Sequence, residues 1–167
     1  MKINVYNTML DEETRHNELK IEKSIICEDS NKLKSPFEIQ KLMKEHFQIH
    51  KKAEEYVYLV SLDMKCNPLG IFELSHGTVN SSLIMPREIF IRALLSGAVG
   101  IIIIHNHPSS DITPSNQDLL VTEKIAQAGE MIGVELLDHI IIGGNEYCSL
   151  KELGVLRERW QYGAFYS

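Results

Sequence analysis

The chain has 167 residues, of which 44% are hydrophobic, and its formal net charge is −6 at pH 7. This length suits one domain with a substantial core, and the acidic balance argues against a protein that binds along a nucleic-acid backbone. There is no apolar run of membrane-spanning length, no signal peptide, and no metal-type spacing among the three cysteines. We therefore expect a cytoplasmic protein with reduced thiols and no membrane association.

Residues 1–34 are expected to form N-terminal strands and a linker. Alternation of apolar and polar residues over 2–6 and 19–27 predicts two strands on either side of a polar turn, and a polar linker follows at 29–34. A helix is then expected from Ser35 to about residue 50. Its first residues supply an N-cap serine, a proline at N1 and a glutamate at N3.

The middle of the chain is predicted to contain a hairpin, a further strand and a helix. Residues 56–62 and 70–74 have the composition of strands and flank a turn, so they are expected to pair. Residues 79–85 are expected to form a third strand. An amphipathic helix over 86–97 begins with a proline and ends at a glycine.

The last third is predicted to contain a buried strand, a long helix and a hairpin. Residues 99–104 are apolar or glycine without alternation, which is typical of a central strand covered on both faces. Residues 119–131 are predicted to be helical. Residues 134–142 and 147–150 are expected to pair across a Gly-Gly-Asn turn, and a short last helix is expected from Ser149.

Two histidines follow the buried strand at a spacing that suggests a metal site. His105 and His107 are two residues apart, so both rings leave the same side of an extended segment, and Pro108 should end the strand beside them. Asp118 lies in the first turn of the next helix, three residues after Ser115. Two imidazoles and one carboxylate form a common three-ligand zinc set, with a fourth position left for water.

The same residues also fit an ordinary helix start. Ser115 would be the N-cap, and Asp118 would be favoured by the helix dipole. A His-x-His pattern alone is more often chance or supporting packing than a ligand pair. The combined spacing, in which His-x-His is followed by seven residues, a serine, two residues and an aspartate, is what makes the metal interpretation specific.

This combined pattern resembles the JAMM motif of the JAB/MPN metalloprotease superfamily, and several further segments are similar to its bacterial RadC branch. These segments are GTVNSS at 77–82, PREIF at 86–90, HNHPS at 105–109, PS at 114–115 and LDHII at 137–141. The likeness covers about residues 35–155. Ser110 departs from it, because the RadC pattern usually has glycine there, so the loop backbone at Ser110 is expected to differ.

The resemblance implies an α/β fold: a mixed, curved β-sheet flanked by helices, with the cytidine deaminase-like architecture of JAB/MPN domains. Residues 35–155 would be the RadC-like domain. Residues 1–34 are too short for the helix-hairpin-helix module that precedes this domain in RadC proteins. Residues 156–167 form an aromatic C-terminal tail, and we expect it to pack on the domain or on a second copy in a homodimer.

The resemblance also implies site roles. One Zn²⁺ per chain would be bound by His105, His107 and Asp118. Glu55 would be the general base, with the adjacent Glu54 as its competitor, because strand alternation lets one of the two face the site. Ser115 would donate to the oxyanion.

Other polar residues near the motif are expected to have structural roles. Asn106 and Ser109 should shape the loop. Asp138 and His139 have apolar neighbours, so we expect a hydrogen-bonded pair at the edge of the core.

Three functions compete. The favoured one is a zinc-dependent hydrolase of peptide or isopeptide bonds, acting on a protein or peptide substrate. The second is a nuclease or DNA-repair factor, which the RadC likeness suggests but the net charge does not support. The third is a zinc-binding interaction module without catalysis, against which the intact ligand pattern argues.

Overall fold

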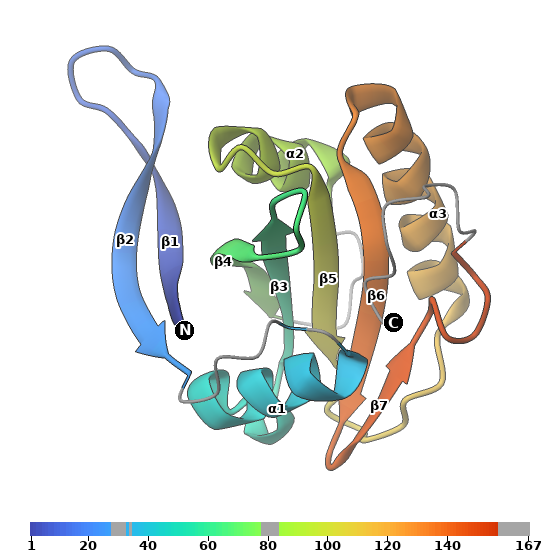
Figure 1. The fold of residues 1–167 in the computed structure, drawn as a ribbon. Coiled ribbons are helices and arrows are strands. Elements are labelled where there is room, and N and C mark those ends of the chain that lie inside the picture. The colour runs from blue at the N-terminus through green and yellow to red at the C-terminus, as the bar shows by residue number, and fades with distance from the viewer. Residues whose placement is uncertain (28–32, 34, 78–83, 157–167) are drawn as a thin grey trace.

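Residues 1–27, 33, 35–77 and 84–156 are described by the structure, a computed structural model. Seven strands within these residues form one sheet, in the order β2-β1-β4-β3-β5-β6-β7 (Figure 1). The strands are β1 Lys2–Leu10, β2 Asn17–Ile26, β3 Glu55–Leu62, β4 Pro68–Gly77, β5 Gly100–Asn106, β6 Glu135–Gly143 and β7 Glu146–Ser149. The helices are α1 Pro36–Phe47, the short 3-10 helix η1 Ile49–Lys51, α2 Pro86–Leu95 and α3 Asn116–Ile132.

The sheet is mixed. Strands β1 and β4 pair in parallel, as do β5 and β6, and the other neighbouring strands pair antiparallel. Helix α1 packs against one face of the sheet, while α2 and α3 pack against the other (Figure 1). The expected α/β class, with helices on both sides of a mixed sheet, is therefore confirmed. No helix in the described part of the chain is long and apolar enough to cross a membrane.

Strand β5 lies inside the sheet and every one of its residues is buried. It pairs with β3 along one edge and with β6 along the other. Ile102 and Ile104 face α1, whereas Ile101 and Ile103 face α2 and α3. Burial on both faces explains why this segment is apolar without alternation.

Several predicted bounds are wrong. Helix α1 ends at Phe47, because Gln48 takes a left-handed conformation with φ 51°. Helix α3 begins at Asn116, three residues before the predicted range of 119–131, but directly after the predicted N-cap Ser115. Residues 84 and 85 precede α2 without forming a strand, while the rest of the strand expected at 79–85 lies mainly outside the described residues. After β7, residues 150–154 form a turn in place of the expected last helix. The predicted linker at 29–34 and the aromatic tail also lie mostly outside the described residues.

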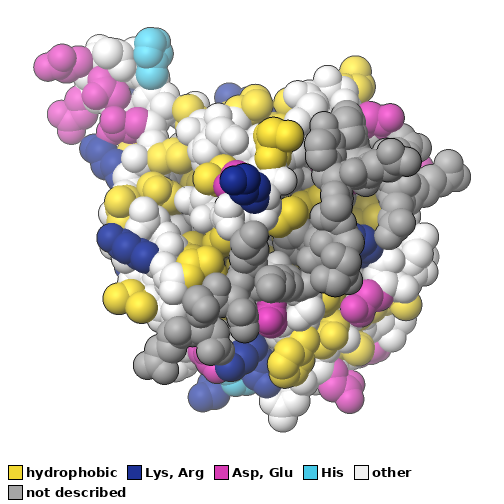
Figure 2. Space-filling model, in the orientation of Figure 1, with side chains coloured by type: hydrophobic (Ala, Val, Ile, Leu, Met, Phe, Trp, Pro, Cys, Tyr) yellow, Lys and Arg dark blue, Asp and Glu magenta, His cyan; other side chains and the backbone are white. Residues whose placement is uncertain are grey.

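The tip of the β1–β2 hairpin extends beyond the rest of the molecule (Figure 1). Acidic side chains gather there, as Figure 2 shows, and they include Asp11, Glu12 and Glu13. The carboxylate of Asp11 closes the turn by accepting from the backbone N–H groups of Glu13 and Thr14. This end of the molecule is therefore acidic.

Gly143 leaves room for the loop that follows the two histidines. A Cβ atom at Gly143 would lie 2.6 Å from the carbonyl oxygen of Ser110 and 2.8 Å from Cγ2 of Ile112. The backbone N–H of His107 also donates to the carbonyl of Ile142, at 2.9 Å. The loop is thus fixed against the end of β6.

We expect Gly143→Ala to lower the free energy of unfolding by about 1–3 kcal/mol, because the loop must shift to admit the methyl group. Chemical denaturation would measure the loss. Lys124→Ala, on the exposed side of α3, is the control and should change stability by less than about 0.5 kcal/mol. Equal stability of the two variants would show that the loop does not depend on this close approach.

Candidate metal centre

Four ionisable side chains from three parts of the chain converge at one end of the central strands. Glu55 begins β3, His105 lies near the end of β5, His107 directly follows that strand, and Asp118 lies in the first turn of α3. One ligand atom from each lies within 4.8 Å of every other. His105 and Asp118 are buried, whereas Glu55 and His107 are partly exposed. The structure therefore brings together a group of residues that could hold a metal ion.

Strand register places Glu55 in this group. Val57 lies opposite His105. Because side chains alternate along a strand, Glu55 shares a sheet face with Val57 and Leu59, and this is the face covered by α3. Glu54 is exposed and lies just before β3. The structure thus favours Glu55 over Glu54, while its role as a base remains a prediction.

Asn106 fixes the start of β3 from the neighbouring strand. Its side-chain carbonyl accepts from the N–H of Tyr56 at 2.8 Å, and its NH₂ donates to the carbonyl of Glu54 at 3.0 Å. The two bonds therefore hold the backbone on both sides of Glu55. The expectation that Asn106 shapes its own loop is therefore wrong, because the amide instead satisfies backbone groups about fifty residues earlier in the chain.

The distances among the two histidines and the aspartate are close to those between ligands of a tetrahedral metal ion. Nε2 of His105 lies 3.0 Å from Nε2 of His107 and 3.3 Å from Oδ1 of Asp118. Nε2 of His107 lies 3.5 Å from Oδ2 of Asp118. Ligands about 2.1 Å from a tetrahedral ion are about 3.4 Å apart. Glu55 Oε1 is 3.9 Å from His105 Nε2, which is slightly outside this spacing.

Burial and charge set the protonation of the three residues. Burial lowers the pKa of His105 well below its usual value. Burial alone would raise the pKa of Asp118, but bonds from His107 and Ser115 and the charge of His105 lower it overall. The contact with Asp118 raises the pKa of His107. A neutral imidazole and an ionised carboxylate are the forms in which histidine and aspartate bind metals.

Glu55 is shifted in the opposite direction from Asp118. Burial raises the pKa of the Glu55 carboxyl; the charge of His107 opposes this rise, and that of Asp118 adds to it. A carboxylate with a raised pKa holds a proton more readily than one in water, which suits a group that accepts a proton and later returns it.

The histidines are held by further polar groups. Nδ1 of His107 donates to the carbonyl of Asp111, at 2.6 Å. Nδ1 of His105 lies 2.8 Å from Nε2 of His139, whose Nδ1 lies 2.6 Å from the hydroxyl of Thr122. Burial lowers the pKa of His139 to about 4. The sequence pattern did not predict the contact of His139 with His105 or that of Thr122 with His139.

Asp138 has a separate, structural set of bonds. Its carboxylate accepts from the hydroxyl of Ser149 at 2.6 Å and from the backbone N–H groups of His139 and Lys151 at 2.7 and 3.0 Å. The expected hydrogen-bonded pair at the core edge is present. Of its two members, His139 is the one that contacts a candidate metal ligand, His105.

Ser115 forms the helix cap and also contacts Asp118. Its hydroxyl accepts from the N–H of Asp118 at 3.1 Å and donates to Oδ2 of Asp118 at 2.6 Å. The same carboxylate oxygen accepts from the N–H of Ser115 at 2.7 Å. This capping box orients a candidate metal ligand, so the helix-start and metal interpretations coexist. The oxyanion role of Ser115 remains a prediction.

Ser110 takes a backbone conformation in which glycine is favoured. Its φ is 64°, in the left-handed region, and its N–H donates to the carbonyl of His107 at 2.9 Å. The turn after the histidines therefore requires a left-handed residue. Serine occupies it at a modest strain.

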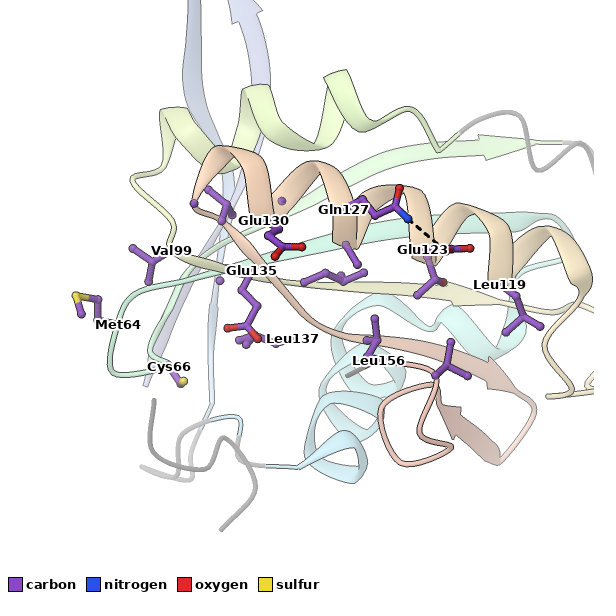
Figure 3. Close-up of a pocket in the computed structure, with 18 of the residues that line it drawn as sticks. Met64, Cys66, Val99, Leu119, Glu123, Gln127, Glu130, Glu135, Leu137 and Leu156 are labelled. Atoms are coloured by element: carbon purple, nitrogen blue, oxygen red, sulfur yellow. Dashed lines mark hydrogen bonds between the residues drawn. The ribbon is translucent and has the colours of Figure 1, made fainter. Parts of the chain in front are cut away.

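A groove of about 780 Å³ lies along α3 and the beginning of β6 (Figure 3). Val99, Leu137 and Leu156 contribute apolar surface, while Glu123 and Glu135 place carboxylates at it. The groove includes none of the four clustered residues. It is a separate feature of the molecule.

The mixed sheet, the paired histidines after its buried strand and the aspartate of the next helix define a domain of the JAB/MPN type. A family model described as a RadC-like JAB domain matches residues 33–155. The chain belongs to this family, and thus to the RadC branch of the JAB/MPN superfamily, as the resemblance predicted.

Three similar proteins, each named UPF0758 protein, illustrate the relationship. The protein of Desulfitobacterium hafniense is 44% identical over 124 residues, covering 74% of this chain and 54% of the relative. That of Clostridium acetobutylicum is 43% identical over 128 residues, covering 77% and 55%. That of Methanosarcina acetivorans is 40% identical over 134 residues, covering 80% and 58%. The chain spans about half the length of these relatives.

We expect Ser115→Ala to lower the free energy of unfolding by about 1 kcal/mol through loss of the cap. It should also weaken zinc binding about tenfold, because Asp118 loses a bond that orients it. Ser35→Ala is the matched control, since Ser35 caps α1 by the same contact to Glu38. It should destabilise the protein similarly and leave zinc affinity unchanged. Denaturation and competition with a zinc-chelating dye would separate the two effects, and equal zinc affinity in both variants would contradict the expectation.

Proposed function

We propose that this chain is a zinc-dependent hydrolase of peptide or isopeptide bonds. The observation that carries the proposal is the position of Glu55. Its carboxylate, with a raised pKa, lies beside two imidazoles and a carboxylate spaced as zinc ligands but slightly outside their spacing. A ligand set with an adjacent base is the arrangement that metal-assisted hydrolysis requires.

His105, His107 and Asp118 would hold the zinc ion. Two neutral imidazoles and one carboxylate suit zinc better than the harder cations calcium and magnesium, which prefer all-oxygen sites. When bound, zinc would lower the pKa of water and polarise the carbonyl oxygen of the substrate.

Glu55 would accept a proton from the attacking water and donate it to the leaving amine. Partial burial makes its carboxyl a stronger proton acceptor than one in water. Because the Asn106 amide fixes the backbone on both sides of Glu55, the carboxylate would approach the reacting atoms from a rigid strand.

Ser115 would stabilise the tetrahedral oxyanion. In the structure its hydroxyl hydrogen is directed to Asp118 Oδ2 at 2.6 Å. Rotation of this hydroxyl toward the substrate would place the donor on the developing negative charge, a contribution of about 3 kcal/mol.

We favour a protein or peptide substrate over a nucleic acid. The net charge is −6, and the described Lys and Arg side chains on the face shown in Figure 2 lie scattered, without forming a continuous stripe. A phosphate backbone is normally bound by clustered positive charge.

We expect elemental analysis of the purified protein to find about one zinc per chain. His105→Ala and His107→Ala should each lose most of it, because each removes one of three protein ligands. His76→Ala is the control, since His76 is exposed and contacts Glu73 outside the cluster. Full zinc content in the His105 and His107 variants after dialysis would show that the ligand assignment is wrong.

We expect Glu55→Gln to keep the fold and the zinc but to lower hydrolysis by at least ~10²-fold, because the amide cannot accept a proton. Fluorogenic peptides and isopeptide-linked substrates, screened first with the zinc-loaded protein, would provide the assay. Glu54→Gln is the matched control, because Glu54 is adjacent but exposed, and it should behave like the unmodified protein.

Two results would contradict the hydrolase proposal. One is Glu55→Gln cleaving substrate at the full rate. The other is the zinc-loaded protein cleaving plasmid DNA but none of the peptides, which would favour the nuclease alternative.

A further inference from the structure

The candidate ligand His105 is hydrogen-bonded to His139, which is in turn hydrogen-bonded to Thr122, and the direction of each bond follows from simple chemistry. The hydroxyl of Thr122 lies 2.5 Å from the backbone carbonyl oxygen of Asp118. A carbonyl oxygen can only accept, so at this distance the single hydroxyl hydrogen must lie between the two oxygens. The hydrogen of Thr122 is therefore committed to Asp118.

The direction of the hydrogen bond between Thr122 and His139 then follows. Nδ1 of His139 lies 2.6 Å from the same hydroxyl. Because Thr122 has no second hydrogen, the hydroxyl must accept here and His139 must donate from Nδ1. His139 is fully buried, and its two ring partners are a hydroxyl and an imidazole. A neutral ring that carries its hydrogen on Nδ1 has a lone pair on Nε2.

That lone pair faces His105. Nε2 of His139 lies 2.8 Å from Nδ1 of His105, so His105 must donate from Nδ1. Its own Nε2 is then left with a lone pair, 3.0 Å from Nε2 of His107 and 3.3 Å from Oδ1 of Asp118. This is the ring form that a cation at the cluster requires.

We propose that Thr122 and His139 are positioning residues that hold His105 in the Nδ1-protonated form, so that its Nε2 lone pair is directed at the candidate metal site. The inference rests on the metal site of the proposed function and not on hydrolysis. The two residues act through His105, and neither would touch the metal or a substrate.

The two histidine ligands are thus oriented differently. His107 lies beyond the end of β5, in the loop, where its Nδ1 donates directly to the carbonyl of Asp111. His105 is inside the sheet, one residue from the end of β5, where the backbone carbonyls are engaged in the strand ladder. A side chain from β6 must therefore accept its hydrogen, and the hydroxyl of α3 must in turn fix the ring form of His139.

Loss of the Thr122 hydroxyl would release this constraint. His139 could then carry its hydrogen on Nε2 and donate to Nδ1 of His105. The ring of His105 would respond by carrying its hydrogen on Nε2, directed into the cluster, where it blocks a ligand position. The two arrangements differ in the positions of two hydrogens and require no movement of the backbone.

Thr122→Val and Thr122→Ser test the proposal in the full chain. Valine has nearly the shape of threonine but no hydroxyl, and serine keeps the hydroxyl. Competition titration with zinc alone should show about 10-fold to 100-fold weaker binding for Thr122→Val. Thr122→Ser should bind within about twofold of the unmodified protein, since the donor remains. Circular dichroism would establish that both variants fold.

A spectroscopic measurement separates positioning from general packing. In the metal-free protein at mildly alkaline pH, nitrogen–proton correlation spectra of the histidine rings should show His105 protonated on Nδ1. This form should persist in Thr122→Ser, and Thr122→Val should shift His105 toward protonation on Nε2. Removal of a packing contact alone would not change which ring nitrogen carries the hydrogen.

Three outcomes would overturn the proposal. They are an Nε2-protonated His105 in the unmodified metal-free protein, unchanged zinc affinity and ring form in Thr122→Val, or equal loss of affinity in the valine and serine variants. Failure of the proposed function gives a different result. If the unmodified protein binds no zinc, the metal site is wrong, while the ring spectra still decide whether Thr122 and His139 orient His105.

Discussion

The pairing of β5 on both edges, together with its burial on both faces, is the constraint on which the rest of the structure depends. Seven consecutive buried residues hold the strand in one register. A shift by one residue would turn Ile101 and Ile103 away from α3 and would also move His105 to the other face. The packing of the core and the geometry of the candidate site are therefore set by the same hydrophobic burial.

Polar groups at the end of this strand are buried with it, and nearly every one has a partner. His105 contacts His139, the amide of Asn106 satisfies two backbone groups of β3, and Asp118 completes the cap of α3. Unpaired polar groups in such a place would lower stability by 1–3 kcal/mol each, by rough estimate. The hydrogen bonds that make this burial tolerable also fix the direction of the candidate ligands.

Stability and the candidate chemistry share their residues here. The capping box of α3 satisfies the backbone N–H groups of Ser115 and Asp118 at the start of a seventeen-residue helix, and it also holds the carboxylate of Asp118 next to both histidines. The backbone carbonyl of Asp118 accepts a hydrogen bond from the hydroxyl of Thr122, which lies one turn later in the same helix. Changes at this helix start should therefore affect folding and metal binding together, unless the two are measured separately.

By itself, the sequence determined the features that depend on neighbours in the chain: the buried strand, the cap and start of α3, the shared side of His105 and His107, and the family. Only the tertiary structure decided between Glu54 and Glu55, because that choice depends on how β3 is registered against β5. It also revealed the contacts of Asn106 with β3 and of His139 with His105, which join residues 50 to 52 and 34 positions apart. Local periodicity carries no information about such partners, since strand pairing and burial select them.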